Sequence, residues 1–211
     1  MGNRAGQILD QVSGLYHRYG IKSVTMDDVA KHLCISKKTL YEYFADKEDL
    51  VGQVMQREQE RWFCLMREID RPGLNAIEEL FEVYKVLKRM YRDYNPSVEF
   101  DLRKYYPSLS KKLQMIRRKM IFESVHRNLI KGKKEGLYRR DLHTEIIAKL
   151  HLVRVENMAV NDMFTIRELT SFKVFHETFV YHLQGIMSPK GRLFFEENFK
   201  KFRDQLDAQP T

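Results

Sequence analysis

The sequence is poor in cysteine, proline and tryptophan: its 211 residues include two cysteines, five prolines and one tryptophan. Two cysteines, Cys34 and Cys64, are too few for a disulfide-linked scaffold, and they fit a reducing compartment such as the cytoplasm. A redox-sensing thiol is the alternative interpretation, but buried, inert thiols are much commoner. The cysteine content therefore favours a cytoplasmic protein whose fold depends on a hydrophobic core.

The sequence also lacks long hydrophobic runs. No segment approaches the roughly 18 consecutive apolar residues of a membrane-spanning helix, and no apolar stretch follows Arg4 as it would in a secretory signal. Hydrophobic residues make up 43% of the chain and charged residues 31%, a balance that is typical of soluble globular domains. We therefore expect a cytoplasmic protein with two closely packed subdomains and no membrane partner.

Motifs of common enzyme and metal sites are missing as well. The sequence has no glycine-rich nucleotide loop, no zinc-protease motif, no nucleophile elbow and no paired-cysteine motif. His176 and Glu177 begin like a zinc motif, but the next histidine, His182, follows six residues later. Six residues rotate a helix by about 600°, so the two histidines point to different faces. We therefore expect no enzyme activity, no cofactor and no metal site.

Acidic residues are fewer than basic ones, and the net charge is +8. This balance suggests a polyanionic partner, but residues 1–50 contain seven basic and seven acidic residues. The excess lies in residues 103–140, with thirteen basic residues and two acidic ones. A run of this kind is usually a solvated helix face, and the alternative is a surface that attracts DNA or an acidic ligand. A DNA-binding role therefore depends on individual lysines rather than on overall charge.

Apolar residues recur at helical spacing along nearly the whole chain, which predicts an all-α fold. Gly20, Pro72-Gly73, Asn95-Pro96 and Gly136 interrupt this pattern as helix stops. The helix that begins at Asp46 should continue to about Ile69, long enough to join an N-terminal head rigidly to a body. The expected helices span residues 8–19, 25–34, 36–44, 46–69, 75–93, 98–105, 108–134, 144–160, 166–187 and 189–206.

Residues 24–51 have the pattern of a helix-turn-helix, in which the second helix enters the major groove. Thr25 and Asp28 form a capping box for the first short helix, and Ser36 is a good N-cap for the second. The second helix packs through Leu40 and Phe44. Its remaining residues are free for other contacts: Lys37, Lys38, Thr39, Tyr41 and Tyr43.

Lys47 lies at the start of the following helix, where the helix dipole disfavours a cation. A lysine is reasonable there if an anion, such as a DNA phosphate, also binds at that helix start. An exposed lysine without a role is the alternative interpretation.

The run A-x-x-x-C-I-S-K-K-T-L-Y-E-Y-F-A-D-K-E-D-L resembles the DNA-binding segment of the tetracycline-repressor (TetR) family of bacterial transcription regulators. The resemblance covers about fifty N-terminal residues. It implies that Tyr41 and Lys47 contact phosphates and that Lys37, Thr39 and Tyr43 face the groove. The predicted DNA-binding set is completed by Thr25, Ser36 and Lys38.

The sequence departs from the family at Cys34, where a glycine is usual. That turn position favours positive φ, which costs a residue with a Cβ roughly 1 kcal/mol or more. We therefore predict a left-handed backbone conformation at Cys34.

The resemblance also implies a division into a DNA-binding domain, residues 1–50, and a helical ligand-binding and dimerisation body, residues 51–211. Helices 144–160 and 166–187 have more apolar surface than one core needs, which predicts a subunit interface. In the family such late helices pair across a two-fold axis. We therefore expect a homodimer that binds a palindromic operator on duplex DNA as a repressor. A helical protein-interaction module with a purely structural head is the alternative.

The family commonly binds a small-molecule inducer in its body. We predict a pocket between helices 46–69, 75–93 and 108–134, although the same residues could simply fill the core. If the inducer is acidic, Arg103, Arg117 and Arg118 in the basic segment are the first residues to test. The predicted walls of the pocket are Trp62, Met66, Phe81, Tyr84, Met115 and Phe122.

Overall fold

The computed structural model describes residues 2–69, 73–92, 95–160, 163–165, 168 and 171–207. The regular elements among these residues are helices, with no strand and one isolated antiparallel bridge between Tyr138 and Met187. The all-α prediction is therefore confirmed. Within the described ranges, no helix is both long enough and apolar enough to cross a membrane.

The first of two compact units comprises residues 1–64 and 93–117. It contains α1 (Gly2–Tyr19), α2 (Met26–His32), α3 (Lys37–Tyr43), the first part of α4 (Lys47–Ile69), α6 (Pro96–Tyr105) and the start of α7 (Pro107–Lys134). Apolar residues from all of the first four helices meet in its core. Its fully enclosed members are Val12, Tyr16, Ile21, Leu40, Leu50, Val51 and Val54.

Side-chain caps define the short helices of this unit, as the sequence predicts. Thr25 caps α2 by accepting a hydrogen bond from the Asp28 amide at 3.1 Å, while the Asp28 carboxylate accepts from the Thr25 amide at 2.9 Å. Ser36 caps α3 by accepting from the Thr39 amide at 3.0 Å. Both expected caps are thus confirmed, and they fix where the turn between α2 and α3 begins and ends.

Cys34 has a φ of 53° in this turn, the one positive φ outside glycine among the described residues. The predicted left-handed conformation is therefore confirmed. Cys34 and Cys64 are both free and exposed, so the expectation that the thiols are buried is wrong. The reason at Cys34 is its place in a tight surface turn, where the side chain has no core to enter.

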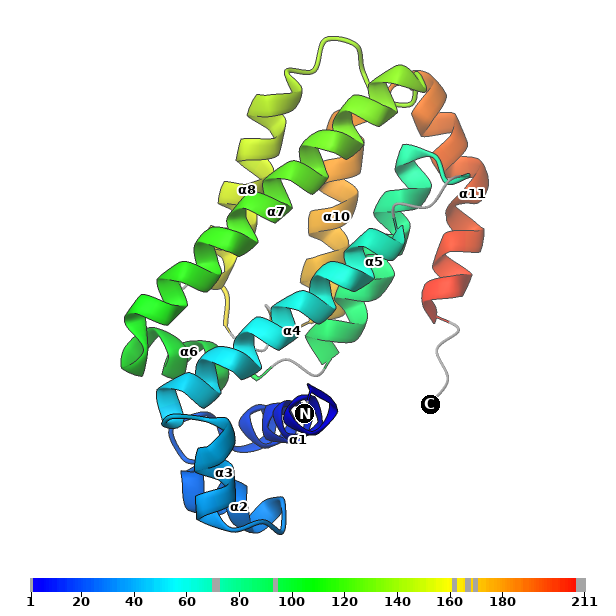
Figure 1. Cartoon of the computed structure of the whole chain (residues 1–211). Coiled ribbons are helices and arrows are strands. Elements are labelled where there is room, and N and C mark those ends of the chain that lie inside the picture. The colour runs from blue at the N-terminus through cyan, green and yellow to red at the C-terminus, as the bar shows by residue number, and fades with distance from the viewer. Residues whose placement is uncertain are drawn as a thin grey trace. The chain divides into compact units, whose positions relative to one another are not determined.

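The second unit comprises residues 65–92 and 118–211. It contains α5 (Ala76–Arg92), the rest of α7, α8 (Thr144–Val160), α10 (Phe172–Ile186) and α11 (Pro189–Asp207). In Figure 1, α10 lies between α8 and α5, and α11 lies beside α5. Apolar residues of these helices form its core, with Ala76, Ile77, Tyr138, Ala148 and Leu183 fully enclosed.

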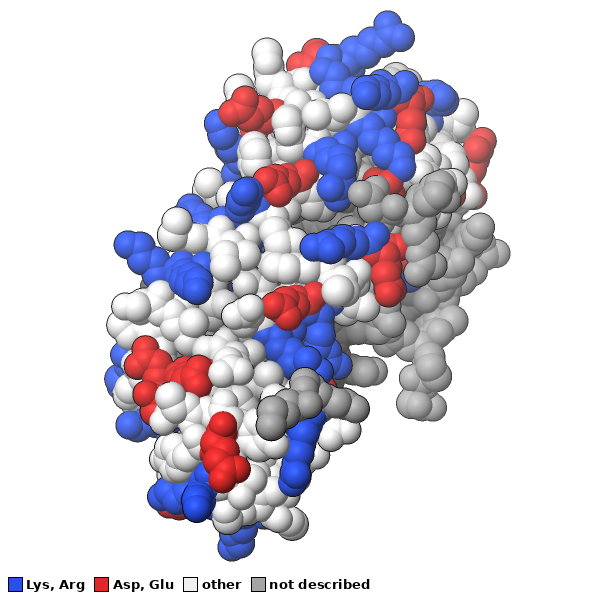
Figure 2. Space-filling model, in the orientation of Figure 1, with Lys and Arg blue, Asp and Glu red and all other residues white. Residues whose placement is uncertain are grey.

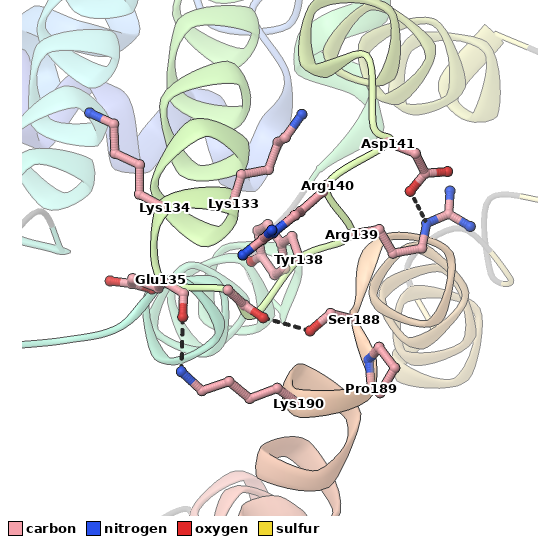
Figure 3. A pocket seen from close by; sticks show the side chains of 11 residues that line it. Lys133, Lys134, Glu135, Tyr138, Arg139, Arg140, Asp141, Ser188, Pro189 and Lys190 are labelled. Atoms are coloured by element: carbon pink, nitrogen blue, oxygen red, sulfur yellow. Dashed lines mark hydrogen bonds and ion pairs between the residues drawn. The ribbon is translucent and has the colours of Figure 1, made fainter.

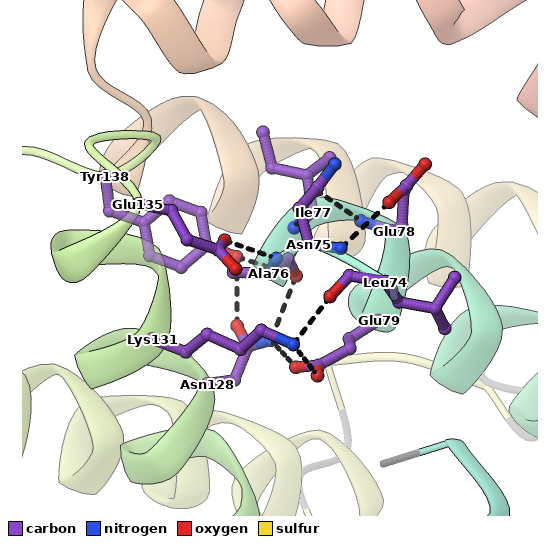
Figure 4. Close-up of polar contacts among 10 residues, drawn as sticks. All are labelled: Leu74, Asn75, Ala76, Ile77, Glu78, Glu79, Asn128, Lys131, Glu135 and Tyr138. Atoms are coloured by element: carbon purple, nitrogen blue, oxygen red, sulfur yellow. Dashed lines mark hydrogen bonds and ion pairs between the residues drawn. The ribbon is translucent and has the colours of Figure 1, made fainter. Parts of the chain in front are cut away.

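A polar network lies inside this second core, at the start of α5 (Figure 4). Asn128 donates to the Ala76 carbonyl and to the Glu79 carboxylate, both at 2.9 Å, and Tyr138 donates to Asn128 Oδ1 at 2.9 Å. Lys131 pairs with Glu79. Because buried polar groups without partners are costly, this network fixes α7 against the first turn of α5.

The prediction of one helix over residues 166–187 is wrong. Ser171 has extended backbone angles, φ −75° and ψ 139°, and its side chain caps a helix that begins at Phe172. The expected capping box is nevertheless present, because the Glu168 carboxylate accepts from the Thr165 amide at 2.8 Å. A helix has a single N-cap, so the cap formed by Ser171 starts a new helix at Phe172 and interrupts the helix predicted over residues 166–187.

Candidate nucleic-acid interface

Helices α2 and α3 form a helix-turn-helix whose outer surface is polar. Leu40 is fully buried and Phe44 is 1% exposed, so these two residues hold α3 against the head. Lys37, Lys38 and Tyr41 are exposed on the other side of α3, and Tyr41 exposes 44% of its surface. This division confirms the packing roles predicted for Leu40 and Phe44. It also leaves a cationic and aromatic surface available to a partner.

Tyr43 has a mixed environment. Its side chain is half-buried and packs against the head core, and its ring centroid lies 6.3 Å from that of Phe44. Thr39 is also half-buried, and its hydroxyl lies 2.8 Å from that of Ser36. Any contact of Thr39 or Tyr43 with a base would therefore involve only the solvent-exposed part of the side chain.

Lys37 of α3 forms an ion pair with Asp27 of α2. Its ammonium Nζ lies 2.9 Å from Asp27 Oδ1 and donates to Oδ2 at 3.1 Å. The hydrogen bond to Asp27 raises the pKa of Lys37, and the negative charge of the same carboxylate adds to this. Both side chains are largely exposed, so the pair contributes little to stability. A phosphate or base edge that binds Lys37 would compete with Asp27.

Lys47, at the first position of α4, is partly buried. Its Nζ donates to the carbonyl oxygen of Ile21 at 2.8 Å and to that of Lys22 at 3.4 Å. Burial lowers the pKa of Lys47, and the neighbouring charge of Lys22 lowers it further. An ammonium has three donors, so these two bonds leave one proton of Lys47 for an anion at the start of α4.

Two further lysines of the first unit, Lys22 and Lys104, were not part of the predicted DNA-binding set. The ammonium of Lys22 lies 4.7 Å from the ring centroid of Tyr105 on α6, and that of Lys104 lies 5.4 Å from the same centroid. Lys22 is linked to α6 a second time, because its amide donates to Asp101 Oδ2 at 2.7 Å. Nothing in the local sequence pairs residue 22 with residues 101–105, since only tertiary packing brings them together.

The predicted ligand-pocket residues have different environments. Phe81 and Tyr84 are buried, and their ring centroids lie 5.3 Å and 4.7 Å from that of Phe179 on α10. Trp62, Met66 and Phe122 are half-buried. Met115 exposes 63% of its surface, so the described side chain is solvated rather than enclosed. The predicted pocket thus stays a prediction, with Phe81 and Tyr84 as its most enclosed members.

An open pocket of about 700 Å³ lies instead where the end of α7 meets the start of α11 (Figure 3). The cations that line it are Lys133, Lys134, Arg139, Arg140 and Lys190. Several of these are already engaged: Lys190 donates to the Glu135 carbonyl at 3.0 Å, and Lys133 donates to the Leu142 carbonyl at 2.8 Å. These bonds tie the loop after α7 to its neighbours.

Basic side chains do not form one continuous patch on the face shown in Figure 2, where acidic residues are interspersed among them. This agrees with the balanced charge of residues 1–50. Among the residues that the structure describes, no group of three or more His, Cys, Asp or Glu side chains is arranged to hold a metal ion. The α3 surface and the start of α4 are therefore the best-defined candidate site.

Comparison with known proteins agrees with this site. Residues 8–54 match the model of the family described as bacterial regulatory proteins, tetR family. Over 80 residues the chain is 26% identical to the HTH-type transcriptional repressor KstR2 of Mycobacterium tuberculosis, a match that covers 38% of this chain and 40% of the relative. The chain thus spans about two-fifths of the length of this curated relative.

Solved structures share the fold over nearly the whole chain. A transcriptional regulator from Cytophaga hutchinsonii superimposes with a TM-score of 0.73 at 20% identity, covering 88% of this chain and 99% of the other. A putative transcriptional regulator from Saccharomonospora viridis, in complex with choline, gives a TM-score of 0.69 at 17% identity, with 89% and 100% covered. At these identities the likeness shows the fold alone. Residues 8–54, which hold the helix-turn-helix, are therefore similar to the DNA-binding segment of the tetR family of bacterial regulatory proteins.

Proposed function

We propose that this protein is a repressor that binds a palindromic operator as a homodimer and is released by a small-molecule inducer. In this proposal residues 1–50 are the DNA-binding domain and residues 51–211 are the regulatory body. The observation that carries it is the exposed surface of α3, with Lys37, Lys38 and Tyr41 in a helix-turn-helix that matches the family model. A curated relative that this chain matches over 80 residues is itself named as a repressor.

A dimer is supported by apolar side chains on the outer faces of α8 and α10. Ile146, Leu150 and Val153 recur at helical spacing on α8 and expose 55%, 59% and 49% of their surfaces. Tyr181 on α10 exposes 78%. Large apolar side chains grouped in this way usually mark an interface. The expected contact through 144–160 and 166–187 is therefore proposed for α8 and for α10, the latter beginning at Phe172.

A two-fold dimer would place two α3 helices on one side of the DNA. Half-sites would then be one helical turn, about 34–36 Å, or a multiple of it apart. An inducer that favours another spacing of the two heads would weaken DNA binding, and DNA would weaken inducer binding by the same factor, typically about 5–150-fold. A solved regulator of the same fold holds a small molecule, choline, which supports a ligand-binding body.

The alternative is a helical interaction module whose head has only a structural role. A structural α3 would need Leu40 and Phe44 but has no use for an outer surface with Lys37, Lys38 and Tyr41. The exposure of these three residues favours DNA binding.

Selection of bound sequences from a random DNA pool, followed by anisotropy titration, tests the proposal. We expect an enriched inverted repeat, with two protomers bound per site and an affinity at least about 10³-fold above that for unrelated duplex. Enrichment of no sequence, together with equal affinity for all duplexes, would contradict a sequence-specific regulator. Enrichment of a single half-site bound by one protomer would contradict the dimer but not DNA binding.

A further inference from the structure

Arg154 on α8 carries a charge that the described part of the chain does not neutralise. Its Nη1 donates to the Thr178 carbonyl at 3.3 Å, and its Nη2 lies 3.1 Å from Nδ1 of His151. Its Nε is enclosed and has no hydrogen-bond partner. Both partners of the guanidinium are neutral groups, and no carboxylate pairs with it among the described residues.

The two histidines beside Arg154 do not balance its charge. The rings of His151 and His182, from α8 and α10, are 4.6 Å apart. Burial, with the neighbouring charges of His182 and Arg154, lowers the pKa of His151 to about 3, and burial together with the Arg154 charge lowers the pKa of His182 to about 4. Both imidazoles are therefore uncharged near neutral pH. Burial also lowers the pKa of Arg154, but a guanidinium still keeps its proton at neutral pH.

Other arginines in the same chain have carboxylate partners. Arg57 holds Asp10 with two parallel bonds, from Nε at 2.8 Å and from Nη2 at 2.9 Å. Arg118 in the basic segment lies 2.9 Å from Glu156, so its charge is already paired. Arg154 has the same Nε and Nη2 edge as Arg57, but none of the described residues accepts a hydrogen bond from its Nε.

Buried charges in proteins are normally paired, because a charge removed from water without a partner is costly. An unpaired, partly buried arginine is therefore a feature that folding alone does not favour. The fork of Nε and Nη2 fits the two oxygens of a carboxylate, as Arg57 and Asp10 demonstrate in this chain. A carboxylate from outside the protomer would supply both the missing charge and the missing acceptor.

The neighbouring residues on α10 indicate what such a ligand would look like. Next to Thr178, the ring of Phe179 packs against Phe81 and Tyr84 of α5. The hydroxyl oxygen of Tyr84 also lies 3.4 Å from Nδ1 of His176. The residue that accepts from the guanidinium, Thr178, is thus followed on α10 by a member of an aromatic cluster of the second unit. This arrangement suits a molecule with an acidic end and an apolar body.

We propose that Arg154 anchors the carboxylate of an amphiphilic small-molecule effector, with Phe179, Phe81 and Tyr84 beside its apolar part. This inference rests on the proposed function, because it names the chemical class of the inducer. The carboxylate replaces the weak contact of Arg154 with His151, and the imidazole turns aside to admit it. Arg154, rather than the paired Arg118 of the basic segment, is the residue that selects an anion.

Thermal unfolding of the full chain with two matched probes tests the site. Octanoate carries the carboxylate, and octanamide has the same chain without the charge. We expect octanoate to raise the midpoint of the wild type by about 2–5 °C, and octanamide to raise it by much less. Arg154→Met should lose the octanoate effect, and Arg154→Lys should weaken it because a lysine has no fork. Lys149→Gln, which removes one exposed charge from the same helix, should keep the full effect.

The thermal unfolding midpoints measured without a probe show whether the carboxylate comes from a ligand or from a second copy of the chain. If the ligand supplies it, Arg154→Met unfolds at the same or a higher temperature than the wild type, since an unpaired buried charge has been removed. If a second copy of the chain supplies it, the variant unfolds at a lower temperature and dissociates in sedimentation, which would overturn the proposal. Equal responses to octanoate and octanamide would also overturn it.

DNA anisotropy on the same samples separates this inference from the proposed function. Wild type and Arg154→Met should bind the selected operator equally without probe, and only the wild type should release it with octanoate. Failure of the wild type to bind DNA would contradict the proposed function, whereas the unfolding midpoints would still report on the carboxylate site.

Discussion

The ammonium of Lys47 and the carbonyl of Ile21 are joined by a hydrogen bond of 2.8 Å, which links the start of α4 to the turn after α1. The bond gives Lys47 a structural role that its position at a helix start does not reveal. It leaves one Nζ proton of Lys47 for a phosphate that would bind at the N-terminus of α4.

We expect Lys47→Ala to weaken binding to all DNA sequences alike and to reduce the salt dependence, log K against log salt, by about one unit per head. Anisotropy titrations of operator and unrelated duplex over a range of salt concentrations measure both effects. Lys119→Ala is the matched control, because it removes an exposed lysine from α7 that lies 3.9 Å from Glu123. An unchanged slope for Lys47→Ala would show that Lys47 serves only the Ile21 carbonyl.

Lys37 should recognise a base in the half-site and not only contribute positive charge. Lys37→Ala is expected to change the preference among bases at one position of the half-site by roughly 1–3 kcal/mol. Asp27→Asn is the complementary variant, because it frees Lys37 from its carboxylate partner and should increase affinity without a new base preference. Competition titrations with single-base operator variants measure the two effects. Equal losses on every operator for Lys37→Ala would contradict base readout.

The positive φ of Cys34 predicts a difference between two substitutions at that turn. Cys34→Gly should be neutral or should raise the free energy of unfolding by up to about 1 kcal/mol, because glycine adopts this conformation without steric cost. Cys34→Val should lower it, since a β-branched side chain tolerates positive φ poorly. Urea denaturation measures both. A valine variant as stable as the wild type would contradict strain at Cys34.

Gly132 on α7 should not accept a side chain. A Cβ there would lie 2.1 Å from the ring of Tyr138, whose hydroxyl is fixed by Asn128. Gly132→Ala should therefore destabilise the protein by roughly 1–3 kcal/mol or more, as overpacked core positions do. Gly52 on α4 has nothing within 4 Å of such a Cβ, so Gly52→Ala should be neutral or stabilising by up to about 1 kcal/mol. Similar urea midpoints for both variants would contradict the packing argument.

The outer face of α8 should hold two protomers together. Leu150→Asp places a charge on a side chain that is 59% exposed in the single chain, so the fold should survive while the dimer dissociates. We expect a monomer with poor operator affinity, measured by sedimentation and anisotropy. Lys149→Ala, at the neighbouring position, is the control that should remain dimeric. A wild type that sediments as a monomer at micromolar concentration, with or without DNA, would refute the interface.

Local patterns predict much of the head because its short helices are defined by contacts close in sequence. Thr25 with Asp28, and Ser36 with Thr39, are three residues apart, so their caps follow from residue identities alone. The left-handed Cys34 follows from its position in the same motif. The break at Ser171 was not predicted, because the capping box of Thr165 and Glu168 predicts the start of one long helix and the second cap, at Ser171, was overlooked.

The sequence by itself determined the helices, the helix-turn-helix and the residues on the outer side of α3, since helical periodicity and capping act over a few residues. Tertiary structure alone decided which charges are neutralised. Lys47 contacts the Ile21 carbonyl, Arg118 contacts Glu156, and among the described residues Arg154 contacts uncharged groups alone. Apart from the contact of Arg154 with His151, these contacts join residues 24 or more positions apart. A charge is paired or unpaired only once packing has placed its neighbours.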